Sequence, residues 1–181
     1  MPTDVQFTIS RLDPDKHRRN EFACEVPELV TYIQQRANRD AREYASACFV
    51  LSPVDDPGKI AGYYTLTNAS ILLAKIPYGL AKKIPRYPEL GAVLIGRMAR
   101  ASEFKGKELG DLLLIDAFER SIRVSEDSAS VAVVVDPKNE KAAAFYKRNG
   151  FQWLDEKRMF ILMAVLKSWK ARGWGIPPTE N

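Results

Sequence analysis

The spacing of hydrophobic positions predicts the elements of the first half of the chain. A helix is expected from about Pro27 to Glu43, because apolar residues recur there at helical spacing: Leu29, Val30, Ile33 and Ala37. Short apolar or alternating runs predict strands at residues 6–9, 47–51 and 60–66, with residues 70–73 a candidate for one more. The turn-rich segment from Pro53 to Gly58 favours a hairpin between the second and third runs.

The second half follows a strand–helix–strand–helix–strand pattern. The expected elements are an unalternating apolar strand at 92–98, a glycine-containing turn at 104–110 with a helix after it, a β-branched strand at 131–135, a helix at 138–149 ended by Gly150, and a last strand at 159–166. Before them, residues 75–88 form a basic, proline-rich loop or short helix. The sequence therefore predicts a mixed α/β fold with helices on both faces of the sheet and a ligand near the Gly106 turn.

Length and composition favour an ordinary globular protein. A chain of 181 residues and 20.4 kDa suits one domain covering residues 1–181, and 46% hydrophobic with 28% charged residues excludes collagen, coiled-coil and disordered classes. No apolar run reaches the roughly 18 residues of a membrane span, and the first residues lack the apolar core of a signal peptide. Cys24 and Cys48 are too few for a disulfide scaffold, which suits a reducing cytoplasm.

The positive charge is concentrated after residue 60. The net charge is +4 in all, from 27 basic and 23 acidic residues, and it divides into −2 over residues 1–60 (8 basic, 10 acidic) and +6 over residues 61–181 (19 basic, 13 acidic). A basic region of this kind suits a polyanionic partner, either a nucleic acid or a phosphorylated cofactor. An ordinary basic surface without such a partner is the alternative.

The turn from Phe104 to Gly110 has the chemistry of an anion site. Glycines let the backbone come close to a ligand, the start of the following helix favours negative charge, and Lys105 and Lys107 add two cations. Neither the Walker loop nor the dinucleotide fingerprint is present. A plain strand–helix connection would look similar, so the turn alone does not identify a function.

Two motifs in order resemble the GNAT superfamily of acetyl-CoA-dependent N-acetyltransferases. The family's pyrophosphate motif is Gln/Arg-x-x-Gly-x-Gly/Ala, and this chain has Lys105, Glu108 and Gly110 at its defining positions. A lysine therefore stands for arginine or glutamine, and a glutamate for the middle glycine. The stretch from Asn139 to Tyr146, followed by Arg148-Asn149-Gly150-Phe151, is similar to the family's Asn-x-x-Ala-x-x-Phe-Tyr…Gly-Phe element.

A closer resemblance covers nearly the whole chain. An ordered series of segments is similar to the tRNA-acetylating toxins of bacterial type II toxin–antitoxin modules: Phe22-Ala23-Cys24 with Leu29 and Tyr32, Gly62–Leu66, Pro85–Pro88 and Gly96–Ala99. Departures are Leu90-Gly91 and Arg100. The resemblance implies a GNAT-like, mostly antiparallel twisted sheet, aminoacyl-tRNA as substrate, blocked translation, a homodimer and a ribbon-helix-helix antitoxin.

The resemblance also assigns roles to residues. Tyr146 would give a proton to the leaving thiolate of CoA, backbone at Met98, Ala99 and Arg100 would pair with pantetheine and contact the oxyanion, and Asn139 would orient CoA. The pyrophosphate would lie on the turn formed by Lys105, Gly106, Lys107, Leu109 and Gly110. From the residues alone, a buried helix tyrosine is the preferred reading of Tyr146, and Met98 and Ala99 could equally be plain strand residues.

Candidate substrate contacts are Arg86, Tyr87 and Arg97, since a cation beside a stacking ring suits an unpaired RNA end. A solvated basic loop is the alternative. The basic tail at about 167–181 contains Trp169 and Trp174, for which packing on the body is favoured over contact with tRNA or a partner. No metal motif occurs, and the lone His17 in a polar stretch is expected to be exposed rather than catalytic.

Two other functions stay open at this point. The same cofactor would serve an N-acetyltransferase of a small amine or a peptide N-terminus. A CoA-binding regulatory module without catalysis is the third reading, which the carboxylate of Glu108 keeps open.

Overall fold

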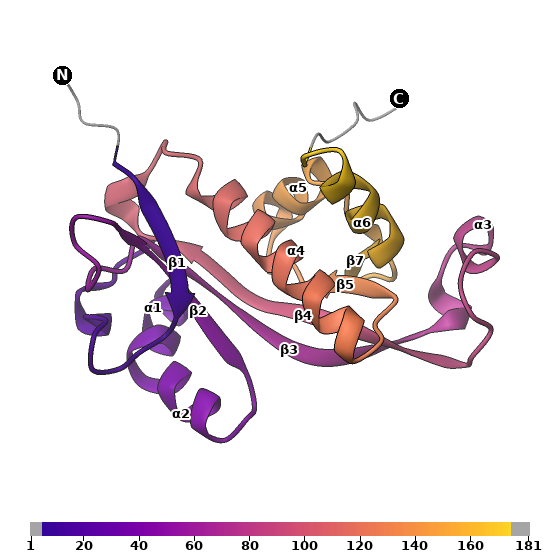
Figure 1. Cartoon of the computed structure of the whole chain (residues 1–181), viewed down its shortest axis with the longest axis horizontal. Helices are drawn as coiled ribbons and strands as arrows, with labels where there is room; N and C mark the ends of the chain where they lie inside the picture. The colour runs from indigo at the N-terminus through magenta and orange to yellow at the C-terminus, as the bar shows by residue number, and fades with distance from the viewer. Residues whose placement is uncertain (1–4, 175–181) are drawn as a thin grey trace. The chain divides into compact units, whose positions relative to one another are not determined.

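A computed structural model describes residues 5–174 (Figure 1). The strands are β1 (Phe7–Arg11), β2 (Ala47–Pro53), β3 (Gly62–Leu72), β4 (Glu89–Arg100), β5 (Ala132–Val135), β6 (Gln152–Trp153) and β7 (Met159–Leu162). The α-helices are α1 (Pro27–Thr31), α2 (Ala37–Arg42), α3 (Tyr78–Ala81), α4 (Leu109–Asp127), α5 (Glu140–Arg148) and α6 (Met163–Ala171). Short 3-10 turns are η1 (Arg19–Glu21), η3 (Leu73–Lys75) and η4 (Ser102–Phe104), and η2 (Tyr32–Arg36) is a π-helical turn.

The strands form one seven-stranded sheet in the order β1-β2-β3-β4-β5-β7-β6. The pairs β1–β2, β2–β3, β5–β7 and β6–β7 are antiparallel. The predicted mixed, mostly antiparallel α/β fold is confirmed. The candidate strand at 70–73 is the end of the long strand β3.

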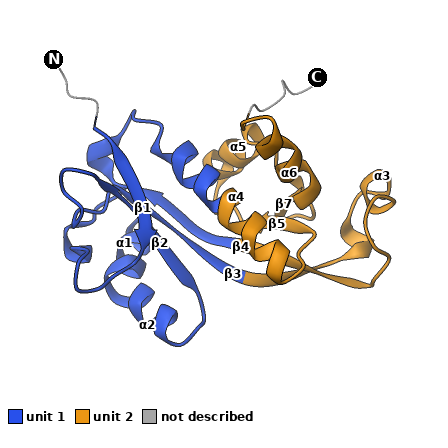
Figure 2. Cartoon of the chain, viewed as in Figure 1, with its two compact units in different colours: residues 1–67, 95–117 blue, residues 68–94, 118–181 orange. Residues whose placement is uncertain are grey.

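The chain divides into two compact units (Figure 2): residues 1–67 with 95–117, and residues 68–94 with 118–181. Strands β3 and β4 and helix α4 each contribute residues to both units. That one domain comprises the whole chain stays a prediction.

In the first unit, helices cover both faces of the strands. Consecutive strand residues point to opposite faces, and β3 shows this at two adjacent tyrosines. The hydroxyl of Tyr63 donates to the carbonyl of Leu29 in α1 at 2.7 Å, whereas the hydroxyl of Tyr64 donates to Asp116 in α4. The predicted helix from Pro27 to Glu43 is present as α1 and α2, joined by the π-helical turn η2.

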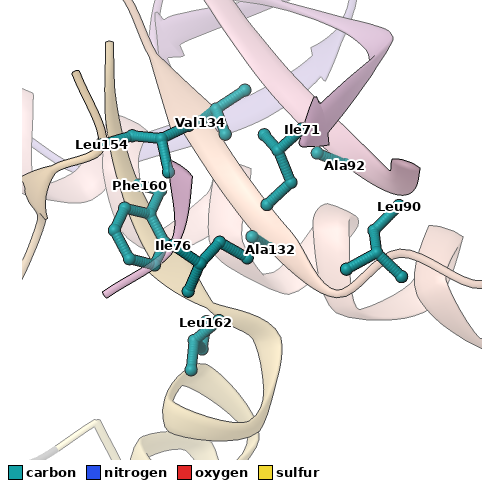
Figure 3. Packing of buried hydrophobic residues seen from close by; sticks show 9 residues of the cluster. All are labelled: Ile71, Ile76, Leu90, Ala92, Ala132, Val134, Leu154, Phe160 and Leu162. Carbon is teal, nitrogen blue, oxygen red and sulfur yellow. The ribbon is translucent and has the colours of Figure 1, made fainter. Parts of the chain in front are cut away.

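The second unit has its own apolar core, built from aliphatic side chains and one aromatic ring (Figure 3). Its members come from β3, β4, β5 and β7 and the segments beside them: Ile71, Ile76, Leu90, Ala92, Ala132, Val134, Leu154, Phe160 and Leu162. Leu80 and Ala81 of α3 and the nearby Ile84 pack against this cluster. The proline-rich segment is therefore a folded arm anchored by apolar residues.

The predicted last strand is too long. The observed strand, β7, ends at Leu162, and residues 163–171 form the helix α6. The reason is spacing, because Met163, Leu166 and Trp169 recur every three residues and are all buried, which places them on one helical face. Trp169 is 7% exposed, and the ring of Trp174 stacks on Phe118 at 6.2 Å. The rest of the predicted tail, 175–181, lies outside the described residues.

Within residues 5–174 no helix combines the length and the apolar character needed to cross a bilayer.

Candidate functional site

Strand β4 ends at a point of close packing in the first unit. A side chain at Gly62 would come within 3.0 Å of both the Ala99 carbonyl and the Leu113 side chain, so the strands and α4 meet here with room only for glycine. Ala99 is buried, while Met98 and Arg100 are partly exposed. The chain leaves the strand through a hydrogen bond from the Ala101 amide to the Ala61 carbonyl at 2.8 Å. The backbone that the resemblance assigns to pantetheine is therefore rigidly held.

The turn that follows has two residues with left-handed backbone. Gly106 has φ +87° and Glu108 has φ +50°. A non-glycine residue in this conformation costs about 1 kcal/mol or more. The turn is fixed at its sides by two apolar side chains, Phe104 and Leu109, which are 8% and 1% exposed. Glu108 thus adopts a backbone conformation that favours glycine.

The dipole of α4 and two lysines attract an anion to the turn, whereas the carboxylates of Glu108 and Asp111 oppose it. Lys105 and Lys107 are exposed beside the start of α4, a 19-residue helix whose N-terminal dipole attracts negative groups, and Gly110 lies in its first turn. Lys105 also reaches back to Glu25, with Nζ 3.2 Å from the carboxylate. Both side chains are more than half exposed, so this ion pair is weak and a phosphate could displace it.

Tyr146 belongs to the second unit, near the end of α5. The helix ends in a Schellman motif, in which the Phe151 amide donates to the Tyr146 carbonyl and the Gly150 amide to the Lys147 carbonyl, both at 3.1 Å. The Phe151 ring meets the Tyr146 ring edge-on at 5.3 Å. Gly150 is left-handed with φ +86°, as the predicted helix end requires.

The environment of Tyr146 keeps its hydroxyl protonated. Burial raises the pKa of Tyr146 above its usual value of about 10. The hydroxyl forms no hydrogen bond to any residue that the structure describes. A protonated phenol without an internal acceptor is suited to donate to a bound group.

Asn139 has a structural task that the sequence prediction did not include. Its side-chain oxygen accepts a hydrogen bond from the Ala142 amide at 2.9 Å and so caps the start of α5. Its assignment to CoA stays a prediction.

The three candidate substrate residues fall in different surroundings. Arg86 and Tyr87 lie in the second unit, on the arm after α3, and Tyr87 is 66% exposed. Nearby on the arm, the Lys82 ammonium lies 4.3 Å from the centre of the exposed Tyr78 ring, a second cation–ring pair that the sequence analysis missed. Arg97 lies in the first unit, on the ring of Tyr32.

The expectation that His17 is exposed is wrong, because the residue is only 3% exposed. Its Nδ1 accepts the Asp13 amide at 2.9 Å, and burial lowers its pKa. Cys48 is also buried, which raises its pKa to about 12. Among residues 5–174, no three His, Cys, Asp or Glu side chains gather in a way that could hold a metal ion.

No family model matches the chain. Two curated proteins are similar over nearly their whole length. The probable toxin TacT of Sinorhizobium fredii is 25% identical over 169 residues, which cover 88% of this chain and 93% of TacT. The tRNA-acetylating toxin of Mycobacterium tuberculosis is 28% identical over 165 residues, which cover 91% of this chain and 96% of the toxin.

Solved structures share the fold. A mutant of KacT matches with a TM-score of 0.83 and 26% identity, covering 90% of this chain and 98% of KacT. AtaT in complex with acetyl-methionyl-tRNAfMet matches with a TM-score of 0.83 and 24% identity, covering 91% and 99%. A mutant AtaT bound to acetyl-CoA and the C-terminus of the antitoxin AtaR matches with a TM-score of 0.76 and 21% identity, covering 91% and 98%.

Proposed function

We infer that this chain is a GNAT-fold acetyltransferase of the tRNA-acetylating toxin type. It transfers the acetyl group of acetyl-CoA to the α-amino group of aminoacyl-tRNA and thereby blocks translation. The observation that best supports this function is the turn from Phe104 to Gly110, which places left-handed backbone and two lysines at the start of α4, an arrangement suited to an anion. Similarity to toxins over some nine-tenths of the chain supports the same activity.

The turn fits the pyrophosphate of acetyl-CoA. The helix dipole favours the negative charge, and Lys105 and Lys107 add attraction. The backbone from Met98 to Arg100 would pair with the pantetheine arm and contact the acetyl oxygen. Acetyl-CoA brings the activated thioester, and the chain's own residues bind and orient it.

The acceptor amine needs little help from the protein. An α-amino group has a pKa near 8, so a useful fraction is neutral at cellular pH. The departing thiolate gains more from a proton, since a thiol has a pKa near 8.5. We propose that Tyr146 supplies this proton from its hydroxyl. The raised pKa of Tyr146 ensures that the proton is present.

The proline-rich arm at 75–88, which includes α3, supports RNA as the acceptor. Its exposed rings, Tyr78 and Tyr87, can stack on unpaired bases, and its cations, Lys82 and Arg86, can contact phosphates. The sequence from Pro57 to Pro88 contains no carboxylate that would oppose them. We propose this arm as a contact for the acceptor end of tRNA.

Partners follow from the same proposal. We propose a cytoplasmic homodimer that is neutralised by a ribbon-helix-helix antitoxin. A structure of AtaT with its antitoxin and acetyl-CoA shows that one protein of this fold binds both.

The test is transfer of labelled acetyl groups. The protein is incubated with radiolabelled acetyl-CoA and total aminoacyl-tRNA, with deacylated tRNA, polyamines and a peptide as parallel acceptors. Label on aminoacyl-tRNA alone is expected, because only that RNA carries the α-amine. Label on polyamines or peptides but not on RNA would instead identify a small-amine or N-terminal acetyltransferase. Acetyl-CoA binding without turnover on any amine would indicate a regulatory module.

A further inference from the structure

Arg97 on β4 combines partial burial, a fixed orientation and the lack of an acidic partner. Its guanidinium carbon lies 3.8 Å from the centre of the Tyr32 ring. Its side chain makes no hydrogen bond or ion pair with any residue in the part of the chain that the structure describes. A guanidinium has five N–H donors, and burying them without acceptors is costly. The guanidinium of Arg97 therefore has N–H donors available for a hydrogen-bond acceptor from outside the chain.

The Tyr32 ring, on which the Arg97 guanidinium lies, is itself fixed by a neighbouring side chain. Tyr32 is the first residue of the π-helical turn η2 and is 3% exposed. Its ring is stacked over Tyr63 at 6.3 Å, and Tyr63 is fixed by its hydrogen bond to the Leu29 carbonyl. Stacking covers one face of the guanidinium and leaves the N–H groups along its edge available.

No titratable group near Arg97 forms an ion pair with it among the described residues. Burial raises the pKa values of Tyr32 and Cys48 to about 12 each, so both side chains are neutral at cellular pH. The pKa of Tyr63 is also raised by burial. Asp40 lies close enough to the Tyr32 hydroxyl to help raise its pKa, and no ion pair joins Asp40 to Arg97 among the described residues.

We propose that Arg97, held on the ring of Tyr32, binds the phosphate on the 5′ side of the terminal adenosine of the acceptor RNA. The inference rests on the proposed function, in which the backbone directly after Arg97 holds the acetyl donor. The aminoacyl group is attached to the terminal ribose, so the phosphate next to that ribose is the anion nearest to the reacting amine. The planar fork of arginine matches two phosphate oxygens. Arg97 thus determines specificity for a nucleotide-borne amine over a free one.

The test uses two acceptors that differ by one phosphate. Pancreatic ribonuclease trims aminoacyl-tRNA to aminoacyl-adenosine with a free 5′-hydroxyl, whereas nuclease P1 leaves the same nucleoside with a 5′-phosphate. For the wild type we expect kcat/KM to be about tenfold or more higher on the phosphorylated acceptor, the effect of a hydrogen bond to a charged group. In Arg97→Gln the ratio of the two values falls to about one. Arg97→Lys keeps the charge without the fork, and we expect an intermediate ratio.

The ring and a second arginine provide the controls. Tyr32→Leu removes the support and lowers the ratio, whereas Tyr32→Phe, which loses a hydroxyl without a partner among the described residues, leaves it unchanged. Arg11 also lies over a ring, Phe49, at 5.5 Å in the same unit, and Arg11→Gln is expected to keep the wild-type ratio. Thermal melting of each variant separates misfolding from altered recognition.

The outcomes separate this inference from the proposed function. An unchanged ratio in Arg97→Gln, an equal loss on both acceptors, or a change confined to the KM of acetyl-CoA would overturn the role of Arg97 while the acetyltransferase activity stands. If the wild type acetylates neither nucleoside nor intact aminoacyl-tRNA, both proposals fall together.

Discussion

Two of the positions with a left-handed backbone have it for different reasons. Glu108, with φ +50°, lies in the turn before α4, and Gly150, with φ +86°, lies just after α5. At Gly150 no side chain fits, because an added Cβ would come 2.2 Å from the Trp169 ring. In the turn of Glu108, by contrast, an added Cβ at the neighbouring Gly106 would meet nothing within 4 Å.

The difference separates a packing constraint from a binding constraint. At the end of α5, the left-handed residue closes the helix so that Tyr146 and Phe151 pack together, and the space is filled by the chain itself. In the turn before α4, the left-handed residues shape an open surface that the chain leaves unfilled. A glutamate can occupy such a position at a cost in backbone energy, but it cannot occupy the other.

Gly150→Ala is the largest expected effect on stability. Left-handed strain and the collision with Trp169 together should lower the free energy of unfolding by about 3 kcal/mol. For a chain of this size, thermal melting would shift down by roughly 10 °C. The matched control is Gly173→Ala, where φ is +70° and nothing lies within 4 Å, so only the strain of about 1 kcal/mol remains. Equal decreases in the melting temperature of the two variants would contradict the claim that Trp169 leaves no room for a side chain at residue 150.

Tyr146→Phe should reduce turnover by about 100-fold, the usual contribution of a general acid. The ring contacts with Phe145 and Phe151 need no hydroxyl, so stability and acetyl-CoA binding should be retained. Steady-state kinetics and calorimetric titration with acetyl-CoA measure the two properties. Tyr44→Phe, at an exposed tyrosine, is the control. Unchanged turnover in Tyr146→Phe would exclude the proton-donor role.

The same residue predicts a pH profile. Turnover should rise as the acceptor amine loses its proton near pH 8. Because burial raises the pKa of Tyr146 above 10, the phenol stays protonated and the rate should show no fall up to pH 10. A rate that declines below pH 10 in the wild type, but not in Tyr146→Phe, would place the pKa of Tyr146 too low for this account.

Glu108→Gly should have a smaller effect with the opposite sign. Relief of left-handed strain, less the extra backbone entropy of glycine, should raise the free energy of unfolding by about 0.5 kcal/mol. Loss of the carboxylate should also lower the KM of acetyl-CoA. Tyr44→Gly is a matched control, since Tyr44 is exposed with φ +56°. It should give the stability gain without the change in KM.

Glu25→Gln is the smallest expected effect. The carboxylate is paired with Lys105 at the surface, so stability should change by only a few tenths of a kcal/mol. The freed lysine should lower the KM of acetyl-CoA by less than about threefold, measured at low salt. Glu21→Gln, which breaks the comparable surface pair with Arg18, should leave that KM unchanged.

The spacing of apolar residues was sufficient to predict most of the helices and strands. The β-branched run before residue 135 and the helix ended by Gly150 are both present, because each rests on local preference that tertiary contacts reinforce. The end of β7 was predicted too late, since a short apolar run fits a buried strand or a buried helix equally well. Met163, Leu166 and Trp169 contain the helical spacing that would have located the boundary.

The candidate site was less accessible to sequence reasoning. Glu108 was identified as a departure from the motif, but its left-handed backbone is a property of the folded turn. The Tyr32 support for Arg97 joins residues 65 positions apart and depends on a π-helical turn with no distinct sequence signal. The cap formed by Asn139 was foreseeable, because an asparagine three residues before a helical amide is a standard start signal.

The burial of His17 gives the protein an internal reporter. It is the single histidine of the sequence, and its side chain is 3% exposed. A reagent that carbethoxylates imidazole can therefore modify His17 only when the segment around Asp13 opens, and its product at the imidazole is followed by the absorbance of N-carbethoxyhistidine. The rate of that modification measures local opening at one defined place, without a label or an engineered residue, in every variant described above.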